Sequence, residues 1–177
     1  MALLIRHPCP DVAKGMCYGQ LDIGLLAGWQ QAMQPALGWS FDAVITSPLR
    51  RCREPAEWLA AQAKVPLAMD SDLMEMHFGQ WEGRAWQDFD GPQARAWAAD
   101  FLNTAPPGGE SLAEMASRVR LALERIVQQC HQPMIVTHAG PIRVLMADRQ
   151  CMALQHMFDL PVDYATVYSL DSLDSLD

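Results

Sequence analysis

Met134-Ile135-Val136-Thr137-His138-Ala139-Gly140 is the stretch that decides the fold, because an apolar run passes directly into polar and small residues. Its first four residues predict a buried strand, and His138-Ala139-Gly140 leads from that strand into a helix. The N-terminal segment Leu3-Leu4-Ile5 ends in the same way, at Arg6-His7-Pro8. Because proline disfavours regular pairing and favours extended geometry before it, we expect His7 to lie where this strand passes into a loop.

Strands and helices alternate along the remaining chain. Further strands are predicted at Ala43–Thr46, Val65–Met69 and Thr166–Leu170, and helices at Trp29–Leu37, Pro48–Gln62 and Ser111–Gln129, with helical pieces between Trp81 and Leu102. Ser47 is predicted to begin the second helix, in which Pro55 is awkward, and Ser111 with Glu114 forms a capping box for the third. This order predicts an α/β fold, a three-layer α/β/α sandwich with a mostly parallel central sheet, as one domain over residues 1–177 with a polar C-terminal end.

Composition excludes several classes of protein. The 177 residues carry a formal net charge of −8, which argues against a nucleic-acid or anionic-membrane binder. No apolar stretch reaches the roughly 18 residues of a membrane span, and the N-terminus does not have the pattern of a signal peptide. The five cysteines are an odd number without a CxxC pair, which indicates reduced thiols in a cytoplasmic protein. They match no metal pattern, so we expect no metal and no cofactor.

Three predicted strands end in polar clusters. These clusters are Arg6-His7, Ser47-Pro48-Leu49-Arg50-Arg51 and Thr137-His138. Ligands of open α/β sheets bind beyond the carboxyl ends of the strands, so the three clusters would build one positive pocket. A compact dianion such as a phosphate monoester is the natural occupant of this pocket.

The same clusters belong to a set of motifs that resembles a known family. The segments are Leu4-Ile5-Arg6-His7, Ser47-Pro48-Leu49-Arg50-Arg51, Leu73 to Gly83, Pro107-Gly108-Gly109-Glu110-Ser111 and Val136-Thr137-His138-Ala139-Gly140. In this order they resemble the histidine phosphatase superfamily, the phosphoglycerate mutase-like group. The resemblance implies a phosphoglycerate mutase-like fold and an enzyme that removes phosphate from small esters without a cofactor.

The resemblance also assigns roles on the phosphate side. His7 would match the nucleophile that takes the phosphoryl group, and Arg6 would match its neighbouring phosphate ligand. The phosphate-binding arginine of the Ser-Pro-Leu-x-Arg pattern would be Arg51 and not Arg50. A neutral imidazole is a competent nucleophile near pH 7, and forked guanidinium donors suit the charge on the phosphoryl oxygens.

The remaining roles concern the second histidine and the acid. His138 would match the second histidine beside the phosphate, with the Ala139 amide as a further donor. Glu75 would match the acid that protonates the leaving oxygen. Glu75 could instead pair with an arginine and hold the pocket together, and Glu82 is the reserve candidate for the acid.

The chain departs from the family pattern at three positions. Pro8 follows the nucleophile where the family has glycine, and the family's asparagine has no counterpart in the loop. Gln20 is the candidate for the missing phosphate contact. Pro55 stands where the family commonly has threonine, which places the geometry of that helix in question.

Two further segments resemble the α-ribazole phosphatase branch of the family. They are Cys17-Tyr18-Gly19-Gln20-Leu21-Asp22 with Leu25, and Glu75 to Glu82. That branch removes the 5′-phosphate from α-ribazole phosphate late in cobalamin biosynthesis. Flat side chains that could stack on its benzimidazole base are Tyr18, Trp81, Trp86 and Trp97. The alternative for each tryptophan is a place in the core.

Other functions stay open at this point. The chain is shorter around the site than the phosphoglycerate mutases, which disfavours a mutase. A phosphatase of other small esters or of phosphohistidine proteins, and a non-catalytic phospholigand-binding domain, are the alternatives. A small-molecule phosphate ester is the expected partner, and exposed apolar helices would also suit a homodimer.

Overall fold

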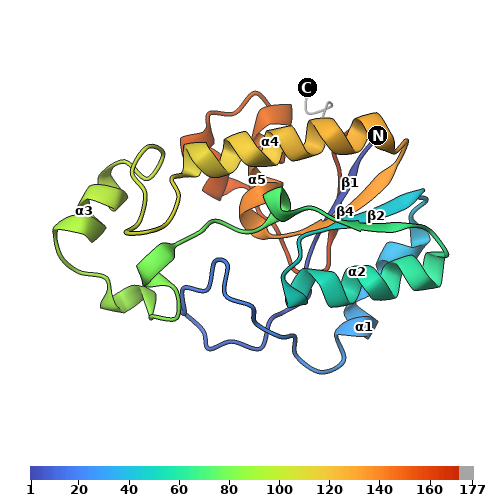
Figure 1. Cartoon of the computed structure of the whole chain (residues 1–177), viewed down its shortest axis with the longest axis horizontal. Helices are drawn as coiled ribbons and strands as arrows, with labels where there is room; N and C mark the ends of the chain where they lie inside the picture. Colours follow the sequence, from blue (N-terminus) through green and yellow to red (C-terminus); the bar gives the residue numbers. More distant parts are fainter. Residues whose placement is uncertain (172–177) are drawn as a thin grey trace.

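Five strands form one sheet in the computed structural model, which describes residues 1–171 (Figure 1). Their order across the sheet is β3-β2-β4-β1-β5. The strands are β1 (Leu3–Arg6), β2 (Ala43–Thr46), β3 (Leu67–Met69), β4 (Pro133–Thr137) and β5 (Val167–Ser169). Strands β3, β2, β4 and β1 are parallel, and β5 runs antiparallel to β1. The predicted mostly parallel sheet is therefore confirmed.

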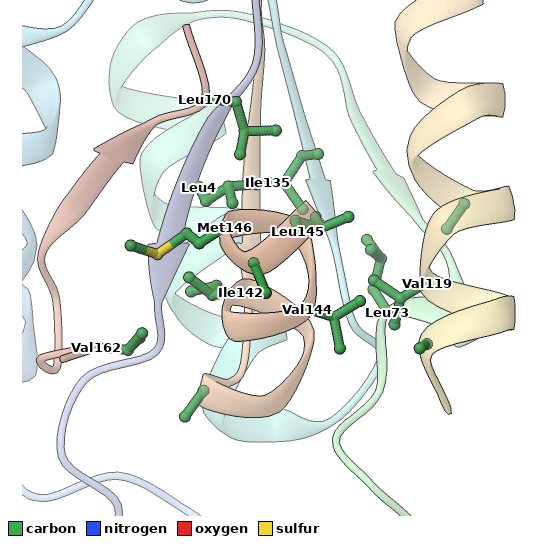
Figure 2. Close-up of a cluster of buried hydrophobic side chains, with 14 of the residues drawn as sticks. Leu4, Leu73, Val119, Ile135, Ile142, Val144, Leu145, Met146, Val162 and Leu170 are labelled. Atoms are coloured by element: carbon green, nitrogen blue, oxygen red, sulfur yellow. The ribbon is translucent and has the colours of Figure 1, made fainter. Parts of the chain in front are cut away.

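Alternation along the strands creates two cores, one on each face of the sheet. Leu4, Ile45 and Ile135 belong to one buried cluster. Figure 2 shows members of this cluster, among them Leu4, Ile135, Val119 and Ile142. Their strand neighbours, for example Leu3, Ile5, Val44, Met134 and Val136, belong to the other cluster. A sheet covered on both faces requires apolar residues at successive strand positions, as the sequence has.

Helices cover both faces. The α-helices are α1 (Trp29–Met33), α2 (Arg50–Ala63), α3 (Pro92–Ala99), α4 (Leu112–Gln129) and α5 (Ala139–Arg149). Helices α1 and α2 pack on the face with Leu3 and Ile5, and α4 and α5 pack on the face with Leu4 (Figure 1). This is the expected three-layer arrangement. None of the helices in residues 1–171 is long and apolar enough to cross a membrane.

The start of α2 differs from the prediction. The helix begins at Arg50 and not at Pro48, and its N-cap residue Leu49 makes no capping bond with its side chain. Asp22 caps it instead from a distant loop, because its carboxylate accepts the Arg50 N–H at 2.7 Å. The Ser47 hydroxyl accepts the Leu49 N–H at 3.4 Å, just before the helix, and lies 2.9 Å from Nε2 of His138. The helix runs through Pro55, which is buried, at the cost of one backbone hydrogen bond.

Other boundaries moved by a few residues. The first predicted helix divides into α1 and a 3-10 helix, Gln34–Gly38, because Pro35 cannot continue the backbone pattern. Strands β3 and β5 are shorter than predicted, and the capping box of Ser111 and Glu114 is present as predicted. The predicted polar end beyond residue 171 lies outside the described residues.

Residues 71–110 connect β3 to α4 and hold little regular structure. They contain the short 3-10 helices Ser71–Leu73, Gly79–Trp81 and Trp86–Asp88 in addition to α3. Helix α3 lies at one end of the molecule, away from the sheet (Figure 1). Aromatic rings hold this segment together, as in the stacked pair Trp81 and Phe89, with centroids 4.9 Å apart.

Candidate active site

The carboxyl ends of three neighbouring parallel strands meet at one edge of the sheet. His7 follows β1, Ser47 follows β2 and His138 follows β4, and these strands are adjacent in the order β2-β4-β1. The rings of His7 and His138 lie edge to face with centroids 5.2 Å apart. The structure thus brings together the polar clusters that the sequence places after separate strands.

The environment of His7 selects one tautomer. Its Nδ1 lies 2.7 Å from the carbonyl oxygen of Pro8, which can only accept a hydrogen bond. Nδ1 therefore carries the proton, and Nε2 keeps a free lone pair. The ring is 2% exposed, and burial, followed by the charges of Arg51 and Arg6, holds the pKa of His7 well below its usual range. The imidazole is consequently neutral at pH 7.

His138 is the N-cap residue of α5 and is fully buried. Its Nε2 lies 2.9 Å from the hydroxyl of Ser47, and the sulfur of Cys52 lies 3.4 Å from the same nitrogen. Burial and the charge of Arg51 hold the pKa of His138 well below its usual range. A neutral second imidazole at the N-terminus of α5, where Ala139 begins the helix, can donate or accept a proton beside an anion.

Arg6 and Arg51 are anchored to backbone carbonyls and retain free donors. Arg51 is fully buried and donates to the carbonyls of Gly19 and Leu21, and Arg6 donates to that of Val162 at 2.7 Å. The Nε–H groups of both arginines are buried without a hydrogen-bond partner among residues 1–171. Because unpartnered buried donors are costly, two of them on cations indicate a binding site for an anion.

Glu75 is held against the start of α5. One carboxylate oxygen accepts from the amide of Gly140 at 3.2 Å, and the other accepts from the amide of Met76 at 3.1 Å. A Cβ atom at Gly140 would collide with the carboxylate of Glu75, so a larger residue there would displace this side chain. The carboxylate of the acid candidate Glu75 therefore contacts the first turn of α5 at Gly140, two residues after His138.

A cavity of about 230 Å³ opens beside Glu75. Tyr18 and Arg143 contribute polar groups to it, and the rest of the lining is mostly aromatic and thioether side chains: Met16, Met76, Phe78, Trp86, Trp97, Phe101, Met115, Met157 and Phe158. Trp86 and Trp97 thus lie where a flat group could stack. Trp81 does not, because it is 5% exposed and packs on Phe89 outside this lining, so its place is in the core.

Arg118 holds the backbone that carries Glu75, and sequence reasoning missed this residue. Its guanidinium donates to the carbonyls of Asp72 and Met74 at 2.7 Å and of Glu75 at 3.0 Å. It also forms an ion pair with Glu110, which in turn accepts the amide of His77 at 2.8 Å. Glu110 belongs to the motif Pro107-Gly108-Gly109-Glu110-Ser111. Arg118 belongs to no motif, and on an amphipathic helix such as α4 the sequence does not distinguish it from a solvated charge.

Gln20 and Glu82 also form hydrogen bonds with the segment that carries Glu75. The Gln20 side chain donates to the carbonyl of Glu75 at 3.0 Å, so its predicted contact with phosphate stays a prediction. One carboxylate oxygen of Glu82 accepts the amides of Gln20 at 3.0 Å and Phe78 at 2.9 Å. Glu82 does not line the cavity, which makes Glu75 the better placed of the two acid candidates.

Arg143 and Tyr164 also lie at the site without having been predicted. Arg143 is half-buried in the cavity wall and donates its Nε–H to Leu160 at 3.0 Å. Tyr164 stacks on Arg6. Both follow from tertiary packing rather than from a local pattern. Among residues 1–171, no group of three or more histidine, cysteine, aspartate or glutamate side chains is arranged to hold a metal ion.

Two neutral histidines and two arginines at the edge of a parallel sheet define an enzyme class that handles phosphate, and comparison with known proteins identifies the family. The model of the histidine phosphatase superfamily (branch 1) matches residues 2–175. The chain belongs to this superfamily, and its predicted phosphoglycerate mutase-like fold is confirmed by its structural neighbours.

Relatives within the family include α-ribazole phosphatases. The adenosylcobalamin/α-ribazole phosphatase of Escherichia coli is 29% identical over 139 residues, which cover 76% of this chain and 68% of that protein. The crystal structure of the α-ribazole phosphatase from Shigella flexneri superposes with a TM-score of 0.84 at 27% identity, over 94% of this chain and 87% of the other. A bifunctional protein of Mycobacterium tuberculosis is 33% identical over 156 residues, 81% of this chain, but the match spans only 42% of that longer protein.

Proposed function

We propose that this histidine phosphatase hydrolyses small phosphate monoesters through a covalent phosphohistidine on His7, with α-ribazole 5′-phosphate or a similar ester as its substrate. The observation that carries the proposal is the state of His7. Its Nδ1–H is committed to the carbonyl of Pro8, and its pKa is well below the usual range. A neutral ring with a free Nε2 lone pair is what nucleophilic attack on phosphorus requires.

The first step transfers the phosphoryl group to His7. The Nε2 lone pair attacks phosphorus, a P–N bond forms and the ester P–O bond breaks. Arg6 and Arg51, with two unpartnered Nε–H groups, stabilise the charge on the phosphoryl oxygens. Glu75, in its protonated form, gives its proton to the leaving oxygen, and the alcohol departs.

The second step returns the enzyme to its starting state. The carboxylate of Glu75 takes a proton from a water molecule, whose oxygen attacks the phosphorus of phosphohistidine. The P–N bond breaks, inorganic phosphate leaves and Glu75 is protonated again. The neutral ring of His138 lies 5.2 Å from that of His7 and can donate a hydrogen bond to the transferred group throughout.

The cavity beside Glu75 supports a leaving group with a flat apolar part. Trp86 and Trp97 line it, and base stacking on aromatic rings suits a benzimidazole. Arg143 lies in the same lining, where its terminal N–H groups can meet ribose hydroxyls. The relationship to α-ribazole phosphatases supports the same choice. The exposed, unpaired thiols of Cys9 and Cys151 support a cytoplasmic location.

Phosphate release from p-nitrophenyl phosphate and α-ribazole 5′-phosphate, measured with EDTA present, tests the proposal. We expect turnover of both by the wild type and none by His7→Ala, with the higher kcat/KM for the ribazole ester. A rapid quench at alkaline pH followed by mass spectrometry should find one phosphoryl group on the peptide that contains His7. A folded wild type that hydrolyses neither ester but binds phosphate would favour a non-catalytic phospholigand-binding domain, and equal turnover of many esters would leave the ribazole assignment without support.

A further inference from the structure

Two tyrosines lie over the two phosphate-binding arginines. The guanidinium carbon of Arg6 is 3.7 Å from the ring centroid of Tyr164, and that of Arg51 is 5.2 Å from the ring centroid of Tyr18. The two phenol oxygens are 3.4 Å apart and share a hydrogen bond. Residues from opposite ends of the chain therefore form one continuous aromatic cover, which we call the tyrosine pair.

The backbone around Tyr164 is fixed to the strand that carries Arg6. The Arg6 side chain donates to Val162 on one side of Tyr164, and the amide of Ala165 on the other side donates to the Arg6 carbonyl at 3.0 Å. Ala165 has a positive φ of 52°, which turns the chain at this point. The ring of Tyr164 also lies 5.6 Å from the ring of His7.

Tyr18 is placed over Arg51 by the bonds of that arginine. Arg51 donates to the carbonyls of Gly19, which directly follows Tyr18, and of Leu21, three residues after it. Burial, followed by the hydrogen bond with Tyr164, raises the pKa of the Tyr18 phenol. The ring that lies over Arg51 is therefore a neutral phenol.

Most groups near the tyrosine pair are shielded from water: His7 is 2% exposed and Arg51 is 0% exposed, whereas Arg6 is partly buried. Electrostatic attraction is stronger where water is excluded, and a guanidinium that stacks on a ring is confined to one plane. The orientation of each guanidinium affects phosphate binding, because its unpartnered Nε–H changes direction whenever the guanidinium rotates.

We propose that Tyr18 and Tyr164 are positioning residues, whose rings hold the guanidiniums of Arg51 and Arg6 in the orientation that binds the phosphoryl group. The inference rests on the proposed phosphate site but not on turnover. Tyr164 makes the larger contribution, since its ring is in closer contact with its arginine. Because the rings and not the hydroxyl groups hold the guanidiniums, we expect phenylalanine to substitute for either tyrosine without loss of phosphate binding.

Binding of inorganic phosphate, measured by isothermal titration calorimetry, tests this inference without catalysis. We expect Tyr164→Leu to weaken binding about tenfold and Tyr18→Leu about threefold. Tyr164→Phe and Tyr18→Phe should stay within about twofold of the wild type. For an ester that is turned over, Tyr164→Leu should raise KM more than it lowers kcat.

The same variants provide the folding controls and the results that would contradict the inference. Thermal unfolding checks each protein, and Tyr164→Met replaces Tyr164→Leu should the latter not fold. Unchanged phosphate binding in the leucine variants would overturn the inference. An equal loss of binding in the phenylalanine and leucine variants would also overturn it, because the effect would then come from the hydroxyl group and not from the ring. A wild type that binds phosphate but hydrolyses no ester would defeat the proposed function and leave this inference standing.

Discussion

The phosphate half of the candidate site is built by the sheet, whereas the leaving-group half is built by irregular chain. We use the first name for His7, His138, Arg6 and Arg51, and the second for Glu75 with the cavity beside it. The phosphate half extends from β1, β4 and the start of α2, so its geometry follows from the packed core. The leaving-group half depends on the bonds of Arg118 to the backbone at Glu75.

This difference teaches how one scaffold serves different esters. Every substrate presents the same phosphoryl group, which the rigid sheet edge can bind in one geometry. Leaving groups differ, and the segment that meets them is held by a few polar contacts and an aromatic cluster outside the sheet. Substitutions in the phosphate half should therefore affect all esters alike, and those in the leaving-group half should discriminate among them.

The largest effect is expected from Arg51→Met. It removes a buried guanidinium from the phosphoryl group, so kcat/KM should fall about 10³-fold for p-nitrophenyl phosphate and α-ribazole 5′-phosphate alike. Arg50→Met is the matched control, because its neighbouring guanidinium is exposed and pairs with Glu54 on the surface. That control should change kcat/KM less than about threefold. Comparable losses in both variants would contradict the choice of Arg51 over Arg50.

Glu75→Gln should separate the two halves. The variant cannot donate a proton to the leaving oxygen, so kcat/KM for α-ribazole 5′-phosphate, which reports the transfer to His7, should fall about 10²- to 10³-fold. The kcat/KM for p-nitrophenyl phosphate should change little, since its leaving group departs as a stable anion, while kcat should fall for both esters because Glu75 also activates the water of the second step. Glu82→Gln serves as the comparison, because its carboxylate bonds two backbone amides and should affect both esters to the same degree. An equal loss of kcat/KM for both esters in Glu75→Gln would remove its role as the acid.

A smaller effect of the same kind is expected from Arg118→Met. Loss of its bonds to three carbonyls lets Glu75 move, and a displacement of about 1 Å costs up to about 10²-fold in rate. The loss should be greater for the ribazole ester than for p-nitrophenyl phosphate. Arg125→Met controls for the charge, because Arg125 pairs with Asp70 and Asp72 at the surface. Steady-state kinetics on both esters, with unfolding curves, distinguishes displacement of Glu75 from general destabilisation.

The sequence predicted the phosphate half better than the leaving-group half, for a physical reason. Strand ends are visible as apolar runs that stop at polar residues, and parallel pairing then places His7 and His138 at one edge without further information. The contacts of Arg118, Arg143 and Tyr164 depend on how distant segments pack, and no local pattern encodes them. Asp22 at the start of α2 is a similar case, since its capping bond spans 28 residues.

The tryptophans show the same limit in a different way. Trp81, Trp86 and Trp97 were each plausible as a core residue or as part of a binding surface, because an aromatic ring in irregular chain suits either place. Only the packing separates Trp81, which stacks on Phe89 in the interior, from Trp97, which lines the cavity.

The smallest effect concerns stability, and it should arise in the phosphate half alone. In the native protein His7 and His138 have pKa values well below the usual range, whereas in the unfolded chain both titrate near pH 6.5. Between these values the unfolded state binds more protons, so the free energy of unfolding should fall as the pH decreases below about 6.5. The slope is at most about 1.4 kcal/mol per pH unit for each histidine, and denaturant unfolding at pH values of about 7.5, 6.5 and 5.5 measures it.

The variant His7→Asn should reduce this slope, because asparagine does not titrate, whereas the exposed His156→Asn should leave it unchanged. An equal slope in His7→Asn and the wild type would mean that the native imidazole takes up its proton as readily as the unfolded one, which would also remove the argument for a neutral nucleophile at the sheet edge.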